Sequence, residues 1–503
     1  MIEKETQMNP NPLVGFLGKN ADEFTREDII RFIEAHEIEM VNFRYVAEDG
    51  KLKSLNFVIN NLNHLREILT TGERIDGSSM FSYIDAGSSD LYVVPRYKTA
   101  FVNPFEEIPT LDILCSYYTS DGKPLQSAPE YLLKKAHKQF QKSTGMNFLA
   151  LGELEYYVMT EREDKEMYPA QDQKGYHASD PFVKFEDFRR EAMLLIAQCG
   201  GQIKYGHSEV GNFHTDDMYY EQQEIEFLPC MAENAADQML IAKWILRKLS
   251  YQYGFTISLA PKITVGKAGS GLHIHMMLEK DGKNMMVSDD KLSDEAKRMI
   301  AGLLEMAAPL TAFGNTIPTS YLRLVPHQEA PTNICWGDRN RSVLIRVPLG
   351  WLGGADMIKD ANPQQKEAQS KGMNKQTVEI RSGDGSADIY SYIAGLIVAS
   401  EYGLKKPDAL KIADELYVDV NIFDEEHKEK LESLEALPES CWESAEALEN
   451  HREVFEENNI FPKGMIDSVI KKLKNFNDKD LSERLYGKNE EIQKLVNKHI
   501  HCM

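Results

Sequence analysis

Residues 269–276 read GSGLHIHM, a His-x-His segment flanked by glycines. Residues two apart along a strand project to the same face, so this segment predicts a β-strand that directs His273 and His275 into one cleft. Two imidazoles on one face can bind a metal ion or a phosphate. The alternative is a pair of ordinary strand histidines with structural hydrogen bonds, and the rest of the sequence bears on this choice.

Carboxylates alternate along further segments of β-favouring composition. GELEYYV (152–158) places two glutamates on one face of a predicted strand, and EIEF (224–227) repeats that spacing. Such acids repel one another unless cations lie nearby, and a divalent ion is one explanation. HSEV (207–210) and TVEIR (377–381) add two more acids, and the full set is Glu153, Glu155, Glu209, Glu224, Glu226 and Glu379.

The ligand chemistry favours a hard cation. Mg²⁺ and Mn²⁺ prefer oxygen ligands and accept an occasional imidazole, as this set would provide. Zinc is less favoured, because its structural sites use closely spaced cysteine and histidine, and the six cysteines are scattered with no CxxC.

Arginines gather in SYLRLVP (320–326), RNRSVLIRVP (339–348) and EIRSGDGSAD (379–388). Guanidinium groups match carboxylate and phosphate oxygens, although any single arginine is more often solvated or in a structural ion pair. Arg341 and Arg346 stand in a segment otherwise rich in valine, leucine and isoleucine. Acids that hold metals beside arginines that hold oxyanions predict phosphoryl transfer. No sequence ending in GK[ST] is present, so a P-loop does not hold the nucleotide.

Composition limits the class of protein. The chain has 503 residues and a formal net charge of −22, so it can hold a small and a large domain and lacks the basic surface that nucleic acid requires. The first 25 residues lack the apolar core of a signal peptide, and no stretch has the length and apolarity of a membrane span. With dispersed cysteines, this predicts a cytoplasmic enzyme with no nucleic-acid or membrane partner.

Local patterns divide the chain into three parts. Residues 1–25 are expected to form a flexible segment, residues 26–122 a small domain, and residues 123–503 a large domain, with a linker-like composition at 120–129. Asp49-Gly50 lies between two alternating runs and predicts a hairpin. The expected elements are a helix at 26–37, the hairpin at 41–59, strands near 91–94 and 111–118, a long helix at 236–254, and solvated amphipathic helices within 424–458.

Several short motifs, in order and with compatible spacing, resemble the glutamine synthetase family of the bacterial dodecameric type. They are IDGSSM (75–80), GELEYY (152–157), KGY (174–176), HSEV (207–210), QQEIEF (222–227), GSGLHIHM (269–276), SYLRLVPHQEAP (320–331), RNRS (339–342) and VEIRSGDGSA (378–387). The resemblance runs from about residue 38 to the C-terminal region. It implies an α+β fold, with a small N-terminal β-grasp domain before a catalytic domain whose curved, mainly antiparallel sheet is backed by helices.

The resemblance also implies a reaction and its ligands. ATP would phosphorylate the γ-carboxylate of glutamate, and ammonium, after losing a proton, would displace phosphate to give glutamine. Two or more Mg²⁺ or Mn²⁺ ions per active site would assist. The ion nearer the amino acid would be held by Glu155, Glu209 and Glu224, and the ion that bridges the ATP phosphates by Glu153, His273 and Glu379.

The resemblance also implies roles for the remaining site residues. His275, Arg341 and Arg346 would contact phosphate groups, and Gly269, Arg323 and Arg381 would bind glutamate. Asp76 and Ser79 from a neighbouring subunit, with Tyr176, would form the ammonium pocket, and Glu329 would be the flap carboxylate. The expected catalytic residues are Asp76, Glu329 and Arg341.

The resemblance implies activity only in a closed homo-oligomer, most simply a dodecamer of two stacked hexamers locked by a tail helix within 481–503. The sequence departs from the family at Ala268 and Thr377, and residues 211–220 make one loop longer. DELY (414–417) matches the adenylylated tyrosine loop too weakly to predict modification of Tyr417. Two alternatives therefore stay open: a γ-glutamyl ligase that uses a larger amine such as a polyamine, and a non-catalytic sensor or scaffold.

Overall fold

The small domain grows from the hairpin predicted around Asp49-Gly50. In the computed structural model, which describes residues 6–84, 87, 89–163, 167–289, 291–325, 330–350, 355–365, 375–423 and 425–502, strands β1 (Met40–Val46) and β2 (Leu52–Val58) pair antiparallel. Strand β1 also pairs parallel with β6 (Thr110–Thr119). The sheet order is β2-β1-β6-β4-β3, with β3 (Glu73–Asp76), β4 (Asp90–Pro95) and β5 (Phe101–Val102), which pairs with β6.

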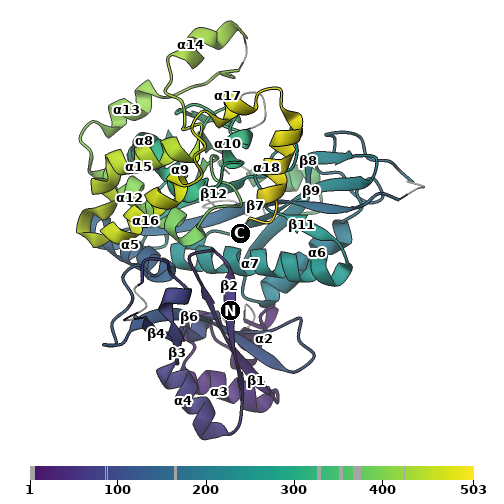
Figure 1. Ribbon diagram of the computed structural model, residues 1–503, viewed down its shortest axis with the longest axis vertical. Coiled ribbons are helices and arrows are strands. Elements are labelled where there is room, and N and C mark those ends of the chain that lie inside the picture. Colours follow the sequence, from purple (N-terminus) through teal and green to yellow (C-terminus); the bar gives the residue numbers. More distant parts are fainter. Residues whose placement is uncertain are drawn as a thin grey trace.

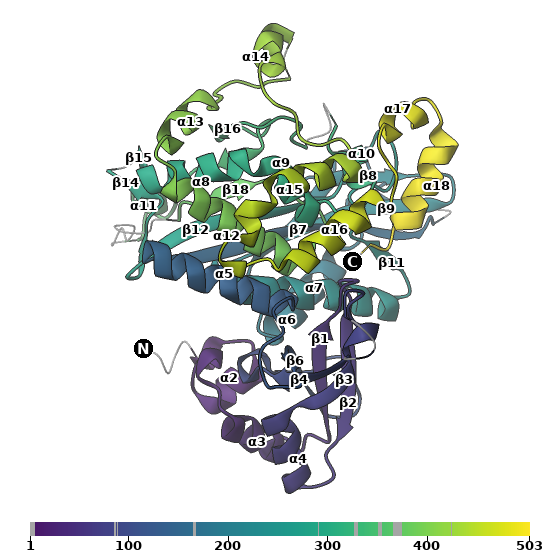
Figure 2. The same cartoon turned by 60° about the vertical axis from the view of Figure 1, so that its left-hand side comes forward.

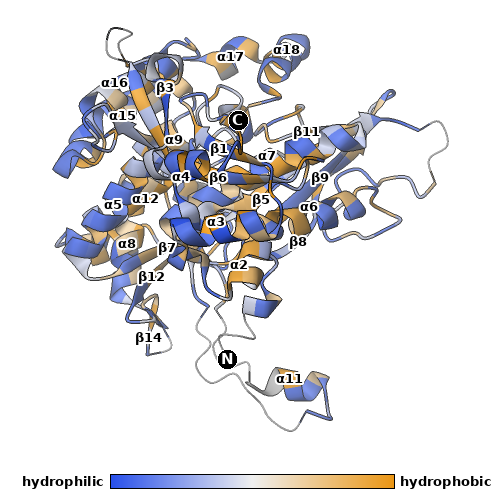
Figure 3. Ribbon diagram, turned by 90° about the horizontal axis from the view of Figure 1, so that it is seen from below, coloured by the Kyte–Doolittle hydropathy of each residue, from blue (hydrophilic) through white to orange (hydrophobic). Residues whose placement is uncertain are grey.

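Two amphipathic helices cover this sheet. Helix α3 (Arg26–Ala35) starts at a capping box between Thr25 and Asp28 and buries its isoleucines and Phe32, as the predicted helix at 26–37 requires. Helix α4 (Leu62–Thr71) packs beside it. Figure 3 shows hydrophilic and hydrophobic residues side by side on α3, which is typical of a helix at the edge of a core.

The N-terminal segment differs from the prediction. Residues 1–25 were expected to be flexible, but α2 (Pro12–Leu17) is a helix in which Leu13 and Val14 are buried in the core of the small domain. The Asn11 side chain caps the Leu13 amide, and Gly18 closes the helix in the left-handed conformation. The two caps and the two buried apolar residues hold this helix against the small domain, although it is too short to show a periodic hydrophobic pattern in the sequence.

The large domain is built on a second, mainly antiparallel sheet. Its strand order is β16-β17-β18-β12-β7-β9-β8, with β10, β11 and β13 at its margins. Among the described strands of this sheet, only β16 and β17 pair parallel. The strands are β7 (Asn147–Glu161), β8 (Ile203–His214), β9 (Met218–Phe227), β10 (Cys230–Met231), β11 (Thr256–Ser258), β12 (Leu272–Lys280), β13 (Lys283–Asn284), β16 (Trp336–Asp338), β17 (Ile345–Val347) and β18 (Val378–Ile380). A separate two-stranded ribbon consists of β14 (Val287–Ser288) and β15 (Lys291–Leu292).

Helices back this sheet. Helix α7 (Ala232–Tyr253) ends at Gly254, as predicted, and lies with α5 (Pro129–Thr144) between the sheet and the small domain (Figures 1 and 2). Gly152 of β7 faces α7, and a Cβ atom there would lie 2.3 Å from Met239 Sδ. The other helices are α6 (Glu186–Gln198), α8 (Asp294–Glu305), α9 (Ala307–Gly314), α10 (Ser320–Arg323), α11 (Ala355–Ala361), α12 (Ile389–Lys405), α13 (Ala409–Glu415), α14 (Lys428–Glu432), α15 (Cys441–Glu456), α16 (Lys463–Lys474), α17 (Leu481–Leu485) and α18 (Asn489–His499).

The tail docks on its own subunit. The Ser258 hydroxyl donates to the Ile500 carbonyl at 2.6 Å, and Arg247 donates to the Cys502 carbonyl at 2.7 Å. Helix α15 lies in the region expected to form solvated amphipathic helices, and its apolar residues Leu448 and Phe455 are buried in the main core. In the described part of the chain, no helix is long and apolar enough to cross a bilayer.

The two domains are joined by buried charges. Arg96 of the small domain forms two hydrogen bonds with Asp237 of α7, at 2.7 and 2.9 Å, and the Tyr390 hydroxyl donates to the same carboxylate at 2.6 Å. The pKa of Tyr390 is raised by burial and by Asp237. This junction holds the small domain against the helices that back the sheet of the large domain.

Candidate active site

Strand register brings the predicted acids and histidines together. Across β7 and β12, Glu153 lies opposite His273, and on the other edge of β7 it lies opposite Glu226 of β9. Glu155 lies opposite Glu224 in the same pair of strands. The remaining cross-strand partners are His275 with Glu379, Arg346 with Glu379, and His207 with Glu224.

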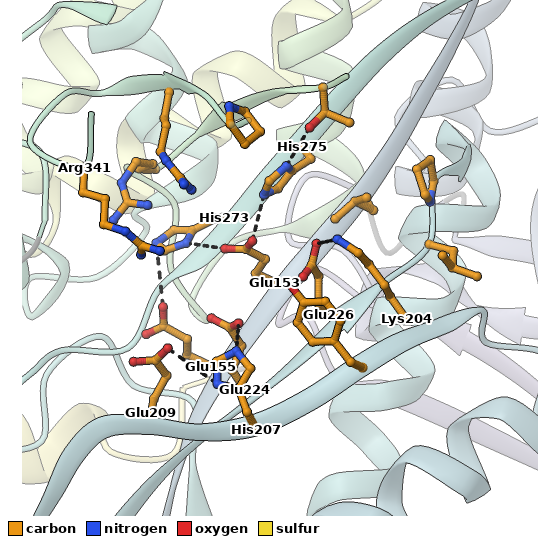
Figure 4. A pocket seen from close by; sticks show the side chains of 18 of the residues that line it. Glu153, Glu155, Lys204, His207, Glu209, Glu224, Glu226, His273, His275 and Arg341 are labelled. Atoms are coloured by element: carbon orange, nitrogen blue, oxygen red, sulfur yellow. Dashed lines mark hydrogen bonds and ion pairs between the residues drawn. The ribbon is translucent and has the colours of Figure 1, made fainter. Parts of the chain in front are cut away.

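Apart from the fully buried Glu379, these side chains line one cavity of about 700 Å³ on the sheet face away from α7. Figure 4 shows the carboxylates and imidazoles converging there from neighbouring strands. The predicted residues that line the cavity are Glu153, Glu155, Tyr176, Glu209, Glu224, Gly269, His273, His275, Arg323, Arg341, Arg346 and Arg381.

Glu153 stands at the centre of the first cluster. Its carboxylate contacts His273 Nδ1 and His275 Nε2, each at 2.9 Å. Burial alone would raise the pKa of Glu153, but the two histidines hold it well below its usual range. Glu153, His273 and Glu379 present ligand atoms that all lie within 4.8 Å of one another, as do Glu153, His275 and Glu226. Buried carboxylate and imidazole donors at this separation fit a divalent ion.

Glu379 is fully buried among cations. Its oxygens lie 2.7 Å from Arg381 Nη1 and 2.9 Å from Arg346 Nη1. Although burial opposes ionisation, Arg381 lowers the pKa of Glu379. His275 is held by Thr377, whose hydroxyl oxygen lies 2.9 Å from Nδ1. Burial lowers the pKa of His275, but Glu153 and Glu379 outweigh it and the net shift is upward.

The second cluster consists of His207, Glu209 and Glu224. Their ligand atoms also lie within 4.8 Å of one another, and His207 Nε2 is 3.1 Å from a Glu224 oxygen. Burial raises the pKa of Glu224 well above its usual range, and the nearby carboxylates of Glu153 and Glu155 raise it further. A buried carboxylate surrounded by other acids is stabilised as an anion by a bound cation.

Glu155 lies beside both clusters and is oriented by two donors. Its Oε2 accepts from the Gly271 amide at 2.8 Å and from the Gln222 side chain at 3.0 Å. Its Oε1 lies 3.8 Å from His273 Nε2. The adjacent Gly269 has no room for a side chain, because a Cβ atom would lie 2.5 Å from the Pro261 carbonyl oxygen.

The predicted arginines differ in their surroundings. Arg323 is buried, which lowers its pKa, and its guanidinium donates to the carbonyls of Ser382 and Arg381 at 2.9 and 3.1 Å. Arg341 is exposed at the wall of the cavity, and Arg346 is half-buried there beside Glu379. All four predicted arginines thus line the cavity, with Arg323 and Arg381 more deeply set than Arg341.

Among the described residues, three of those predicted are absent from the lining of this cavity: Asp76, Ser79 and the fully buried Glu379. Asp76 and Ser79 are in the small domain, where hydrogen bonds from Ser79 and Ser78 to the exposed Asp76 lower its pKa. Glu329 lies outside the described residues.

The structure adds lining residues that were assigned no role from the sequence: Lys204, His207, Gln222 and Glu226. Alternation had already placed Glu226 on the same strand face as Glu224. It would also have found His207, which stands two residues before Glu209. Lys204 forms a 2.5 Å ion pair with Glu226, but a register irregularity between Ile203 and Tyr205 hides it from a period-two pattern.

Comparison with known families accords with this architecture. The model for the glutamine synthetase catalytic domain matches residues 126–485, and the model for the glutamine synthetase β-grasp domain matches residues 37–120. The chain belongs to the glutamine synthetase family. Membership confirms the α+β fold and the class of enzyme expected above, an ATP-dependent glutamate–ammonia ligase that synthesises glutamine.

Curated glutamine synthetases are similar in sequence to this chain over most of its length. The glutamine synthetase of Thermotoga maritima is 28% identical, with 94% of this chain and 99% of that protein aligned, and that of Methanococcus maripaludis is 27% identical over 84% and 90%. The enzyme of Thermococcus kodakarensis is 30% identical over 81% and 83%. A cryo-electron microscopy structure of Plasmodium falciparum glutamine synthetase shares the fold, with a TM-score of 0.73 and 21% identity, covering 93% of this chain and all of that one.

Proposed function

We propose that this glutamine synthetase joins ammonium to the γ-carboxylate of L-glutamate through a γ-glutamyl phosphate intermediate, releasing ADP and phosphate. The observation that carries the proposal is the single cavity in which two carboxylate–histidine clusters lie beside Arg341, Arg346 and Arg381. A carboxylate becomes a good electrophile only when its oxygen leaves as phosphate, and such a cavity can neutralise the charges that meet during transfer.

Two or more Mg²⁺ or Mn²⁺ ions would occupy these clusters. The donor sets fit, because Glu224 is a buried acid surrounded by other carboxylates and Glu153 converges with His273 and Glu379. In the proposed assignment, Glu155, Glu209 and Glu224 hold one ion, and Glu153, His273 and Glu379 hold the other. Bound ions would supply charge neutralisation to the phosphate oxygens.

The other lining residues would bind and orient the substrates. His275, Arg341 and Arg346 are assigned to ATP phosphates and to the transferred group, and Gly269, Arg323 and Arg381 to glutamate. The exposed position of Arg341 at the cavity wall suits a residue that closes on a bound anion. Gly269 suits a close approach of substrate to the backbone, because no side chain fits there.

The ammonium pocket would be shared between subunits. Tyr176 is 49% exposed at the cavity, whereas Asp76 and Ser79 are exposed on the small domain of the same chain. We assign Asp76 and Ser79 to the cavity of a neighbouring subunit in a dodecamer of two stacked hexamers. Asp76 and the flap residue Glu329 would bind ammonium and remove its proton. The six free cysteines accord with a cytoplasmic location.

The test is product formation by the purified protein with ATP, glutamate and Mg²⁺ or Mn²⁺, with and without ammonium. The proposal predicts ammonium-dependent phosphate release and one glutamine per phosphate, measured by mass spectrometry. Release with a polyamine but not with ammonium would contradict it, as would the absence of release with every amine. The comparisons do not favour either of those alternatives.

A further inference from the structure

His207 occupies an unusual position for a residue outside the predicted metal set. It lies on β8 opposite Glu224 of β9, and its Nε2 is 3.1 Å from Glu224 Oε1. Its Nδ1 lies 3.1 Å from the carbonyl oxygen of Ser208 and 3.8 Å from Glu209 Oε1. The imidazole is therefore placed between the two carboxylates of the second cluster (Figure 4).

The contact with Ser208 fixes the tautomer of the ring. A carbonyl oxygen can only accept a hydrogen bond, so Nδ1 carries the proton and donates it. In the neutral ring, Nε2 then presents a lone pair to the Glu224 carboxylate, which is also an acceptor. Two acceptors 3.1 Å apart need a cation or a proton between them.

This arrangement is typical of a metal ligand. Histidines that bind metals usually donate their other ring N–H to a backbone carbonyl or carboxylate, which orients the lone pair and raises its basicity. The His207 ring is also fixed by aromatic neighbours: ring centroids lie 4.1 Å away for His177 and 5.5 Å away for Tyr176. Its side chain is only 13% exposed. The ring is thus oriented before any ion binds.

We propose that His207 is a direct ligand, through Nε2, of the divalent ion held by Glu209 and Glu224. The inference rests on the proposed function for the presence of that ion, and it adds a nitrogen donor to a set otherwise made of oxygens. Glu155 would offer this ion its Oε1, because its Oε2 already accepts two N–H donors. Imidazole binds Mn²⁺ and Co²⁺ more readily than Mg²⁺, so His207 would bias this site toward transition metals.

A metal-binding measurement without nucleotide or glutamate tests this separately from catalysis. Metal-stripped full-length protein is titrated with Mn²⁺ alone, and free Mn²⁺ is followed by electron paramagnetic resonance. His207→Phe keeps an aromatic ring in the stack but removes Nε2, and His177→Phe is the matched control in the same stack. We expect His207→Phe to weaken one class of Mn²⁺ site by about tenfold or more, and His177→Phe to change no affinity by more than about twofold.

A competition with Mg²⁺ supplies a second readout. His207→Phe should lower the preference of that site for Mn²⁺ over Mg²⁺, and the ¹⁴N coupling assigned to His207 should disappear from the spectrum of bound Mn²⁺. If His207→Phe does not fold, as judged by its melting temperature, His207→Gln takes its place.

Unchanged Mn²⁺ affinities in the folded variant would overturn the inference, because they would leave His207 as a residue that merely positions Glu224. Wild-type protein that binds Mn²⁺ at a His207-dependent site but makes no glutamine would refute the proposed function and leave this inference standing.

Discussion

Glu153 links both histidines of β12, with one oxygen 2.9 Å from His273 Nδ1 and the other 2.9 Å from His275 Nε2. The two imidazoles of the His-x-His segment are thus joined through a single carboxylate on the next strand. Because Glu153 also belongs to two of the metal-compatible groups, it is the residue on which most of the site converges.

Glu153→Gln keeps the size of this side chain and removes its charge. We expect glutamine formation to fall by about a hundredfold and Mn²⁺ binding to weaken, because a proposed ligand and the partner of two histidines are lost together. Steady-state rates and Mn²⁺ titration check both effects. Glu161→Gln, at the exposed end of the same strand, is the control and should behave as wild type. Full activity of Glu153→Gln would exclude its role as a ligand.

Sharing of the active site predicts complementation between two inactive variants. Asp76→Asn removes the carboxylate assigned to a neighbouring subunit, and Glu379→Gln removes a carboxylate assigned to a metal ion in the site of its own subunit. Each variant alone should lose nearly all activity. Co-expressed at equal amounts, they should regain about a quarter of wild-type activity, since random mixing completes one site in four. A mixed assembly as inactive as its two inactive parents would place Asp76 and Glu379 in the same subunit's site. Full activity of Asp76→Asn alone would place Asp76 in no site.

Glu130 predicts a pH dependence of stability. It lies in the first turn of α5, accepts the Tyr117 amide at 3.0 Å, and its pKa is raised by burial from 4.5 to about 7. The folded protein therefore binds this proton more tightly than the unfolded chain. The resulting stabilisation is fully present below pH 4.5 and is lost as the pH rises through about 7.

Relative to Glu130→Gln, the wild type should lose about 3 kcal/mol of stability across this range. Melting temperatures of the two proteins from pH 4.5 to 8 measure the difference. The exposed Glu107→Gln should follow the wild-type profile. Parallel profiles for wild type and Glu130→Gln would show that Glu130 does not titrate in this range.

The Lys204–Glu226 ion pair predicts a strong coupling. The Glu226 side chain is only 2% exposed, and Lys204 Nζ lies 2.5 Å from one of its oxygens. Lys204→Met leaves this carboxylate buried without its cation and should destabilise the protein by about 1–3 kcal/mol. The double variant Lys204→Met/Glu226→Gln should recover most of that loss, and a double-mutant cycle from thermal unfolding measures the coupling. Simple additivity would mean that the pair contributes no net interaction.

Local sequence patterns could predict much of the fold and the strand faces on which the site residues lie, but not how those strands pair. Alternation placed Glu153 and Glu155 on one face of a strand, and Asp49-Gly50 marked the hairpin of the small domain. The pairing of Glu153 with Glu226 could not be predicted, because the register between β7 and β9 is set by packing of residues distant in sequence.

Other differences have local causes. The long loop expected at 211–220 proved to be mostly strand, since β8 and β9 continue through it with one irregularity between Ser208 and Asn212. Helix α2 is too short for a periodic signal, and its caps decide its conformation. Lys204 lines the cavity because of a register shift in β8, which a periodic sequence pattern does not reveal.

The most direct test of the central claim follows one oxygen atom. Glutamate with ¹⁸O at both γ-carboxylate oxygens is incubated with the protein, ATP, ammonium and Mg²⁺ or Mn²⁺. The ¹⁸O content of the phosphate and of the glutamine is then measured by mass spectrometry. Attack of the carboxylate on ATP followed by displacement with ammonia predicts one ¹⁸O in each phosphate released and one retained in each glutamine. Phosphate free of ¹⁸O would contradict a γ-glutamyl phosphate intermediate and with it the proposed chemistry of this cavity.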